Sequence, residues 1–462
     1  MIVRARIAPS PTGFPHIGTI FQALINYAFA KNADGQFIVR IEDTDRTRYV
    51  EGAEDAIFQA LEWFGITPDE SPRHDGKYGP YRQSEKLDRY KERAEWLVGQ
   101  SKAYYCFCTA EELDQMRKEQ QKAGKPPMYN GKCRELDPKE AKKKAQNEPH
   151  VIRMKIISTE ATLNINDDIR GVISFEKNLI DDQVILKSDG YPTYHLGVVV
   201  DDYDMKITHV IRGEEWISST PKHVLLRQYF GWDKEPLSFL HTPLLRNPDG
   251  SKLSKRNNHA AVSWYKEKGF LAEAILNYLA NLVFNHPKGE IYSLEEFIKS
   301  FGDRKKMHSV GARFDLAKLE WMNGEYIRRM EKSKLKTQIY EFFNKKYPEE
   351  LIEKIIPLVQ ERIKTLLEFE TMAKFFFERP VSYEKEIGLS QKKQMQEFFE
   401  PVVQWNHDEL LQRSRQFAEE KKLSFKDFAM DMRIILTGSK IGPPLFESIE
   451  ILGKEETLER LK

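Results

Sequence analysis

PSPTGFPHIGT, from Pro9 to Thr19, is the stretch that decides how the N-terminal part of this chain folds. Before it, Ile2–Ala8 mixes β-branched residues with arginine and predicts a strand that ends at the first proline. After it, apolar residues recur at helical spacing from His16 to about Lys31, so the HIGT turn opens a helix. A helix N-terminus presents unpaired N–H groups and a positive dipole end, which stabilise phosphate. The stretch therefore predicts a phosphate site where a strand gives way to a helix.

Two residues of this turn suit a reacting phosphate. Gly18 has no Cβ, so the backbone and a nucleotide can approach each other closely. His16 can donate a hydrogen bond to a phosphate oxygen and stabilise the charge that builds up during attack on the phosphorus. An isolated HIG tripeptide is more often the cap of an ordinary helix, so the interpretation needs a second signal.

That second signal is KLSKR, at Lys252–Arg256, directly after the turn-forming run Asn247–Gly250. A basic pentapeptide alone is usually a solvated loop. A loop carrying Lys252 and Lys255, however, can close over a triphosphate and neutralise the charge that passes to the leaving pyrophosphate. Together the two motifs predict a site where the α-phosphate of ATP is attacked.

Strands and helices alternate through the rest of the first half. We expect strands at Phe37–Ile41, directly before Glu42, and at Ile207–Arg212, and a helix at Pro221–Phe230. The near-continuous apolar run Leu196–Val200 predicts a strand buried on both faces. This alternation indicates an α/β fold with a parallel sheet. The sheet is interrupted by an insert of about a hundred residues, from Leu87 to Tyr194.

From about Ser263 onward the chain is rich in Leu, Glu, Lys and Phe at helical spacing, which predicts an all-helical C-terminal third. The expected helical stretches are Phe270–Phe284, Leu335–Tyr347, Glu349–Phe376 and Gln391–Glu400.

Composition excludes several classes of protein. The 462 residues are too many for one core, and 40% hydrophobic with 31% charged residues describes a soluble multidomain protein. The net charge of +1 does not by itself favour a nucleic-acid partner. We find no apolar run of membrane-spanning length and no signal-peptide pattern. Three cysteines, an odd number, do not suit a secreted disulfide framework, so we expect a cytoplasmic protein.

The order PSPTG, HIGT and KLSKR resembles the signature of class I aminoacyl-tRNA synthetases. The residues within these motifs resemble those of the bacterial-type glutamyl-tRNA synthetase family, and the resemblance extends over the whole chain. The resemblance implies a Rossmann-like parallel-sheet catalytic domain, an inserted α+β domain for the acceptor end of tRNA, and an all-helical anticodon-binding region. The implied boundaries are 1–86 and 196–242 for the catalytic domain, 87–195 for the insert, 243–329 for the KLSKR loop and stem-contact domain, and 330–462 for the helical region, divided near 380–390.

The resemblance also implies a reaction. L-glutamate is activated with ATP and Mg²⁺ to glutamyl-adenylate and transferred to the 3′-terminal adenosine of tRNA-Glu. The implied catalytic residues are His16, Gly18, Lys252 and Lys255, of which His16, Gly18 and Lys255 bind ATP. The family's glutamate-binding positions correspond to Arg6, Ala8, Ser10, Glu42, Tyr194 and Arg212. Val198 departs from family members that place an asparagine there.

Chemistry independent of the resemblance supports this pocket. Arg6, Glu42 and Arg212 lie at or just past predicted strand ends, the edge where open α/β sheets bind ligands. The planar arginine fork suits a carboxylate, whereas glutamine would turn an NH₂ group toward the same donors. Aspartate is excluded less strongly, because one methylene is worth only about 10–200-fold.

The three thiols, Cys106, Cys108 and Cys133, resemble a zinc site that lacks one ligand. Some family members use a Cys-x-Cys followed by Tyr and Cys, which here corresponds to Tyr129 and Cys133; the fourth ligand is Tyr129, Glu135 or absent. Any zinc is expected to be structural, and a metal-free remnant is the alternative.

The expected macromolecular partner is tRNA-Glu, bound by a monomer without membrane contact. Arg362 resembles the arginine that family members use against the third anticodon base. The alternatives are a glutaminyl enzyme, a shortened paralogue that modifies tRNA-Asp, and a non-catalytic tRNA-binding protein with the same fold. The helical C-terminal third disfavours the first two, and the intact HIGT and KLSKR motifs disfavour the third.

Overall fold

The computed structural model of the chain describes residues 2–157, 161–251, 253, 260–302, 306–311 and 313–462. It divides into two compact units. The first comprises Met1–Val262 and Leu276–Phe314, and the second comprises Ser263–Ile275 and Asp315–Lys462. We describe each unit by itself.

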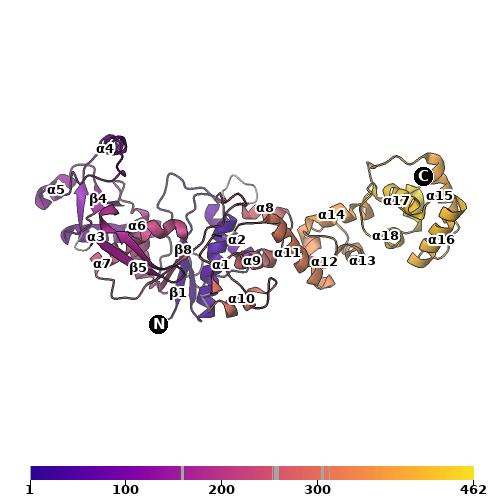
Figure 1. Cartoon of the computed structure of the whole chain (residues 1–462), viewed down its shortest axis with the longest axis horizontal. Helices are drawn as coiled ribbons and strands as arrows, with labels where there is room; N and C mark the ends of the chain where they lie inside the picture. Colours follow the sequence, from indigo (N-terminus) through magenta and orange to yellow (C-terminus); the bar gives the residue numbers. More distant parts are fainter. Residues whose placement is uncertain (1, 158–160, 252, 254–259, 303–305, 312) are drawn as a thin grey trace. The chain divides into compact units, whose positions relative to one another are not determined.

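A six-stranded sheet organises the first unit (Figure 1). In spatial order its strands are β2 (Gln36–Val39), β1 (Arg4–Ile7), β8 (His209–Gly213), β9 (Ser238–Thr242), β5 (Thr162–Asp167) and β6 (Gly171–Glu176). The neighbours from β2 to β5 pair in parallel, and β6 is antiparallel to β5. The predicted parallel α/β sheet is confirmed, and the carboxyl ends of β1, β2 and β8 meet at one edge.

Helices cover this sheet and the inserted segment. The helices of the first unit are α1 (Ile17–Asn32), α2 (Ala53–Trp63), α3 (Leu87–Gly99), α4 (Ala110–Lys122), α5 (Pro138–Ala145), α6 (Tyr194–Asp204), α7 (Thr220–Phe230) and α10 (Leu294–Ser300), and α9 (Ala272–Asn281) runs from the second unit into the first. Apolar residues of α6, α7, β8 and β9 form one core, in which Val199, Leu226 and Phe239 are buried. This core holds α6 and α7 against the sheet.

The strand predicted at Leu196–Val200 is wrong, because these residues lie inside α6. Helices α3 and α7 and strand β7 (Val184–Leu186) all contact α6, so its apolar residues are buried on several sides. A helix buried in this way has a near-continuous apolar sequence, which periodicity alone cannot distinguish from a buried strand.

The segment 87–195 contributes to two sheets. Strands β3 (Ala103–Cys106), β4 (Val151–Met154) and β7 form a separate antiparallel sheet beside α3. The hairpin of β5 and β6 instead extends the six-stranded sheet, with Asp167 beside Phe239 of β9. An α+β insert is therefore present within this segment, and its exact limits stay a prediction.

Within 315–462 the structure describes helices and no strand, which confirms the predicted helical region. The helices are α11 (Leu316–Arg329), α12 (Lys332–Phe342), α13 (Glu349–Val359), α14 (Leu367–Ala373), α15 (Leu389–Phe399), α16 (His407–Glu420), α17 (Phe425–Thr437), α18 (Leu445–Leu452) and α19 (Lys454–Arg460), preceded in the chain by α8 (Val262–Glu267). Two apolar cores occur, one around Ile355 and Phe369 and one around Phe399 and Met432.

Candidate active site at the carboxyl edge of the sheet

His16 is the N-cap of α1, as the HIGT turn predicts. Its backbone is extended, with φ −113° and ψ 166°, and its Nδ1 accepts a hydrogen bond from the Gly18 N–H at 3.1 Å. In the neutral ring the proton therefore lies on Nε2. Gly18 has a second role beyond close approach, since a Cβ there would come within 2.9 Å of the His16 ring. The glycine thus permits the histidine to cap the helix.

The segment that follows KLSKR returns to this turn. Ala261 pairs with His16 in an isolated antiparallel bridge, and the Val262 N–H donates to the Pro15 carbonyl at 3.2 Å. Before the motif, Gly250 N–H donates to the Asn247 carbonyl at 2.8 Å, so the predicted turn is confirmed. Lys252 and Lys255 themselves lie outside the described residues.

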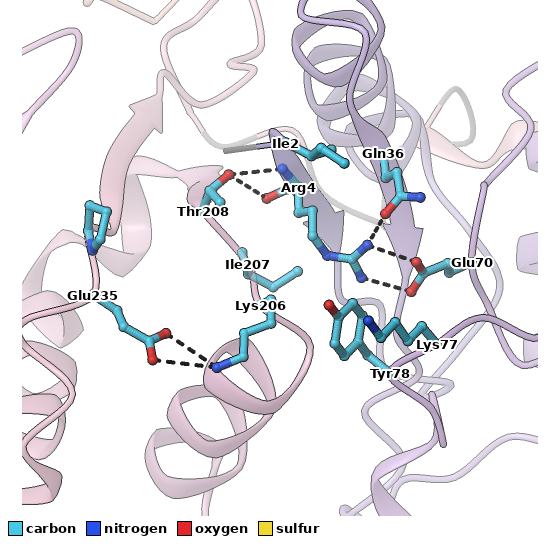
Figure 2. Close-up of a pocket in the computed structure, with 11 residues that line it drawn as sticks. Ile2, Arg4, Gln36, Glu70, Lys77, Tyr78, Lys206, Ile207, Thr208 and Glu235 are labelled. Atoms are coloured by element: carbon cyan, nitrogen blue, oxygen red, sulfur yellow. Dashed lines mark hydrogen bonds and ion pairs between the residues drawn. The ribbon is translucent and has the colours of Figure 1, made fainter.

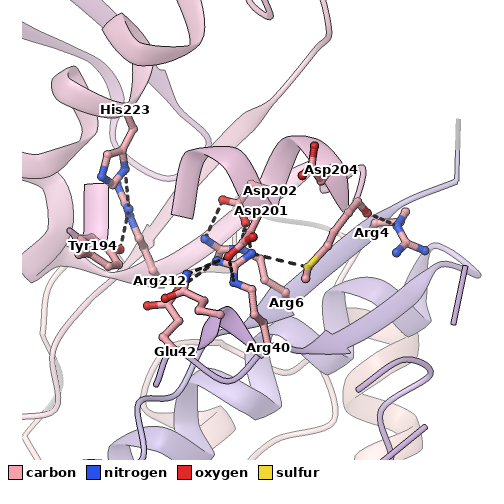
Figure 3. Close-up of polar contacts among 12 residues, drawn as sticks. Arg4, Arg6, Arg40, Glu42, Tyr194, Asp201, Asp202, Asp204, Arg212 and His223 are labelled. Carbon is pink, nitrogen blue, oxygen red and sulfur yellow. Dashed lines mark hydrogen bonds and ion pairs between the residues drawn. The ribbon is translucent and has the colours of Figure 1, made fainter. Parts of the chain in front are cut away.

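Arg6 belongs to a buried ion-pair cluster beside the same edge (Figure 3). Its Nε and Nη2 donate to the two carboxylate oxygens of Asp202 on α6, at 2.9 and 3.0 Å. Arg40, which follows β2 and is fully buried, donates to Asp202 at 2.7 Å and to Glu42 at 3.0 Å. Asp202 therefore joins β1 and β2 to α6, a role that the sequence pattern does not predict.

These contacts shift the ionisation of both acids. Burial opposes ionisation of Asp202, but the cations of Arg6 and Arg40 outweigh it and lower the pKa of Asp202 to about 2. For Glu42 burial is the largest influence, and it raises the pKa in spite of Arg40. The charged pair Asp201–Lys86, with a 2.7 Å contact, lies next to this cluster on α6.

Arg212, in β8, has no ion pair with any carboxylate that the structure describes, in contrast to Arg6. Instead its five N–H groups meet neutral acceptors: Tyr194 Oη at 3.1 Å, His223 Nδ1 at 3.1 Å, His241 Nε2 at 3.2 Å, Thr220 Oγ1 at 2.9 Å and the Trp216 carbonyl at 3.4 Å. The Arg212 residue is 6% exposed, and burial lowers its pKa. A buried cation with only neutral partners attracts a carboxylate ligand.

The other residues predicted to bind the glutamate substrate lie next to Arg212 or to the ion-pair cluster. The Glu42 N–H donates to the Pro9 carbonyl at 3.1 Å, which brings Glu42 beside the Ala8–Ser10 segment. Tyr194 begins α6 and contacts Arg212 through its hydroxyl. Val198, the departure from the family pattern, is buried in the apolar core.

Sequence reasoning missed Arg40, Asp202, His223 and His241. One available signal was the Asp201-Asp202 pair directly after an apolar run, because adjacent acids at the end of a buried segment need cationic partners. The two histidines carry no such local signal.

A cavity of about 460 Å³ opens elsewhere on the first unit, at the amino end of β1 (Figure 2). Arg4 lines it and donates to both oxygens of Glu70 at 2.8 Å, while Lys206 pairs with Glu235 at 3.4 Å. Arg4 and Arg6 are thus committed to different acids, and the cavity is remote in the sheet from the His16 turn.

The three cysteines gather as predicted, with sulfur atoms within 4.8 Å of one another. Tyr129 Oη lies 3.5 Å from the sulfur of Cys106 and 3.4 Å from that of Cys108, which is 3.7 Å from the sulfur of Cys133. Tetrahedral ligands at ~2.3 Å from zinc are about 3.7 Å apart. The three thiols are close enough to hold the metal, and the Tyr129 hydroxyl lies beside them. Glu135 is exposed and pairs with Arg134 and Lys155 instead.

Arg362 lies in the turn after α13, so the helix predicted over Glu349–Phe376 is interrupted there. Its side chain is exposed. Arg433 of α17 is close enough for the Arg362 charge to contribute, after burial, to a lowered pKa of Arg433. The charges of Arg362 and Arg433 therefore lie near each other in the second unit.

None of the helices that the structure describes has the length and apolarity needed to span a bilayer.

Comparison with known proteins agrees with this geometry. Residues 2–321 match the family model for tRNA synthetases class I (E and Q), catalytic domain, and residues 327–462 match an anticodon binding domain. The chain is 46% identical to a glutamate–tRNA ligase of Thermus thermophilus, over 100% of this chain and 99% of the relative. It is 42% identical to that of Fusobacterium nucleatum, over 100% and 96%.

Solved structures give the same result. A glutamate tRNA ligase from Elizabethkingia meningosepticum, in complex with its amino acid, superposes with a TM-score of 0.88 at 38% identity, covering 100% of this chain and 98% of that one. A glutamate-tRNA synthetase from Elizabethkingia anophelis has a TM-score of 0.87. The chain therefore belongs to the bacterial glutamate–tRNA ligases, a family of class I aminoacyl-tRNA synthetases.

Proposed function

We propose that this chain activates L-glutamate with ATP and transfers it to tRNA-Glu. In the first step a glutamate α-carboxylate oxygen attacks the α-phosphorus of ATP, which forms glutamyl-adenylate and releases pyrophosphate. In the second step a ribose hydroxyl of the terminal adenosine takes the glutamyl group and releases AMP. No side-chain nucleophile is required, so catalysis consists of positioning and charge stabilisation.

The observation that carries this proposal is Arg212, a buried cation bonded only to neutral groups at the edge that also holds His16. The cluster around it holds four cations and three acids, a net charge of +1 when Glu42 is ionised: Arg6, Arg40, Arg212 and Lys86 with Asp201, Asp202 and Glu42. Free glutamate carries two carboxylates and one ammonium, a net charge of −1. Substrate and pocket therefore neutralise each other.

Within this pocket we assign Arg212 to the side-chain carboxylate, with Tyr194 beside it, and Glu42 to the ammonium group. Arg6 and the Ala8–Ser10 segment complete the glutamate site. A substrate carboxylate would replace two of the neutral acceptors of Arg212, Tyr194 Oη at 3.1 Å and the Trp216 carbonyl at 3.4 Å, and would accept two charge-assisted hydrogen bonds. The NH₂ group of glutamine cannot accept hydrogen bonds in this way.

His16 is assigned to the triphosphate, through a donor Nε2–H, and Gly18 to the close approach of the nucleotide. Lys252 and Lys255 are assigned to the β- and γ-phosphates from their motif. Mg²⁺, when bound with ATP, would offset phosphate charge.

The insert and the helical region are assigned to tRNA. Cys106, Cys108, Cys133 and Tyr129 would hold a structural zinc that stabilises the insert. Arg362 is assigned to the third anticodon base. As a translation enzyme the protein would work in the cytoplasm, and we propose that it does so as a monomer.

The test is aminoacylation of purified tRNA-Glu and tRNA-Gln with labelled glutamate, with and without ATP. We expect ATP-dependent charging of tRNA-Glu; absence of glutamate charging on either tRNA would refute the proposal. Charging of both tRNAs would retain the chemistry and remove the discrimination assigned to Arg362.

Pyrophosphate exchange tests the role of His16. His16→Ala is expected to lower the exchange rate about 100-fold, because a phosphate-stabilising donor is lost, while the KM for glutamate changes little. The exchange is measured with tRNA-Glu present, since the family resemblance implies that bound tRNA is needed. A near-normal rate would remove His16 from the first step.

A further inference from the structure

In every hydrogen bond between Arg212 and its neutral neighbours, Arg212 is the donor. Arginine can only donate, so His223 Nδ1 must accept from Arg212 at 3.1 Å. The proton of the neutral His223 ring therefore lies on Nε2, which donates to His195 Nδ1 at 3.0 Å. His195 thus selects the His223 tautomer that presents a lone pair to the guanidinium.

A second branch has the same logic. His241 Nε2 accepts from Arg212 Nε at 3.2 Å, so the His241 proton lies on Nδ1 and donates to Asp167 at 2.7 Å. The same Asp167 oxygen accepts from the His241 backbone N–H at 3.0 Å. Asp167 lies in β5, the strand that pairs with β9, and it fixes both the tautomer and the position of His241 in β9.

Both inner histidines remain uncharged in this environment. His223 is 3% and His241 1% exposed, and a second proton on either would point an N–H at the Arg212 N–H. Burial is the largest influence that lowers the pKa of each ring, and the Arg212 charge adds to it. Neutral acceptors therefore hold Arg212 in place without compensating its charge.

We propose that His223 and His241 are positioning residues that hold Arg212 through neutral acceptors, fixed in tautomer by His195 and Asp167, so that the guanidinium charge remains available to a substrate carboxylate. This inference rests on the proposed glutamate activation. Arg6, whose fork is closed on Asp202, provides the contrast within the same site. An acid at position 223 would pair Arg212 internally and remove its preference for a carboxylate over an amide.

Two substitutions of equal size separate charge from shape. In His223→Asn the Oδ1 atom can replace Nδ1 as a neutral acceptor, so the KM for glutamate is expected to stay within about 3-fold of the parent value. In His223→Asp a carboxylate competes with the substrate for Arg212, and the KM is expected to rise about 30-fold or more. The turnover at saturating glutamate and the KM for ATP should change little in both variants.

The ratio of glutamate to glutamine activation is the second readout. The substrates are nearly isosteric, so a role confined to packing would not change their ratio. We expect the preference for glutamate to fall at least about 10-fold in His223→Asp and to persist in His223→Asn. Equal KM values and equal ratios in the two variants would overturn the proposal. Failure of the parent enzyme to activate glutamate at all would instead refute the proposed function.

His195 provides an independent test if His223→Asp does not fold. His195→Phe removes the acceptor that sets the His223 tautomer and should raise the KM for glutamate about 10-fold at near-normal turnover. His195→Asn, whose Oδ1 can replace Nδ1, should restore most of that loss. A KM unchanged in His195→Phe would contradict the tautomer relay.

Discussion

Asp202→Asn is the most informative perturbation of the fold around the site. The Asp202 carboxylate binds Arg6 through two hydrogen bonds and Arg40 through a third, at 2.7–3.0 Å, and the residue is 4% exposed. The asparagine retains nearly the same shape and one acceptor oxygen. The change therefore removes the charge that two buried guanidinium groups require.

The structure sets the magnitude. The fall of the Asp202 pKa from its ordinary 3.8 to about 2 corresponds to about 2.4 kcal/mol of favourable interaction in the ionised form. Breaking a buried pair typically costs about 3–5 kcal/mol, because the partner charges are left uncompensated. We therefore expect the first unit to lose about 2–5 kcal/mol of unfolding free energy.

Hydrogen exchange during urea titration can measure this loss in β1 and β2 separately from the helical unit. The matched control is Asp204→Asn on the same helix, whose closer partner Arg89 lies at 3.0 Å and is about one-third exposed. Its second partner, Lys86 at 3.5 Å, retains the shorter 2.7 Å pair with Asp201 in this variant. Surface pairs contribute about 0–1 kcal/mol, so the control should change little. A loss below about 1 kcal/mol in Asp202→Asn, or equal losses in both variants, would refute the reasoning.

Four further predictions concern the His16 turn, Asp202, the cysteine cluster and Arg362. Gly18→Ala should lower the pyrophosphate exchange rate at least about 10-fold, because its Cβ would displace the His16 ring; unchanged kinetics would contradict that steric argument. On acidification, the first unit should lose about 2 kcal/mol of unfolding free energy between about pH 4 and pH 2, as Asp202 is protonated. The pKa of Asp202 is lower in the folded than in the unfolded protein, so the ionised carboxylate stabilises the fold fully only above the unfolded pKa. Urea titrations should show this loss in the parent and not in Asp202→Asn. Cys133→Ser should reduce bound zinc, measured by atomic emission, and increase exchange in the insert, whereas a metal-free parent would refute the zinc assignment. Arg362→Gln should raise glutamate charging of tRNA-Gln relative to tRNA-Glu, and an unchanged ratio would exclude Arg362 from anticodon selection.

Sequence patterns predict correctly those helices and strands whose turn residues or periodicity lie within the segment itself. The strand before Pro9, the helix opened by His16 and the helical C-terminal region all follow from turn residues and periodicity, and the structure confirms them. The run Leu196–Val200 predicts a strand but lies inside α6, because this helix is buried on several sides and its sequence there shows no helical periodicity. Tertiary burial, not local preference, decided that element.

The chemistry of the site divides in the same way. Glycine and histidine in HIGT predict a phosphate-binding turn from local sequence, because a helix N-terminus is built from contiguous residues, and KLSKR supports that prediction as a second, separate signal. The pairing of Arg6 with Asp202 joins residues 196 positions apart, and that of Arg212 with His223 depends on how α7 lies against β8. Which arginine keeps its charge for a ligand is therefore decided only by the tertiary structure, since ionic and hydrogen-bonded partners act through distance in space and carry no mark in local sequence.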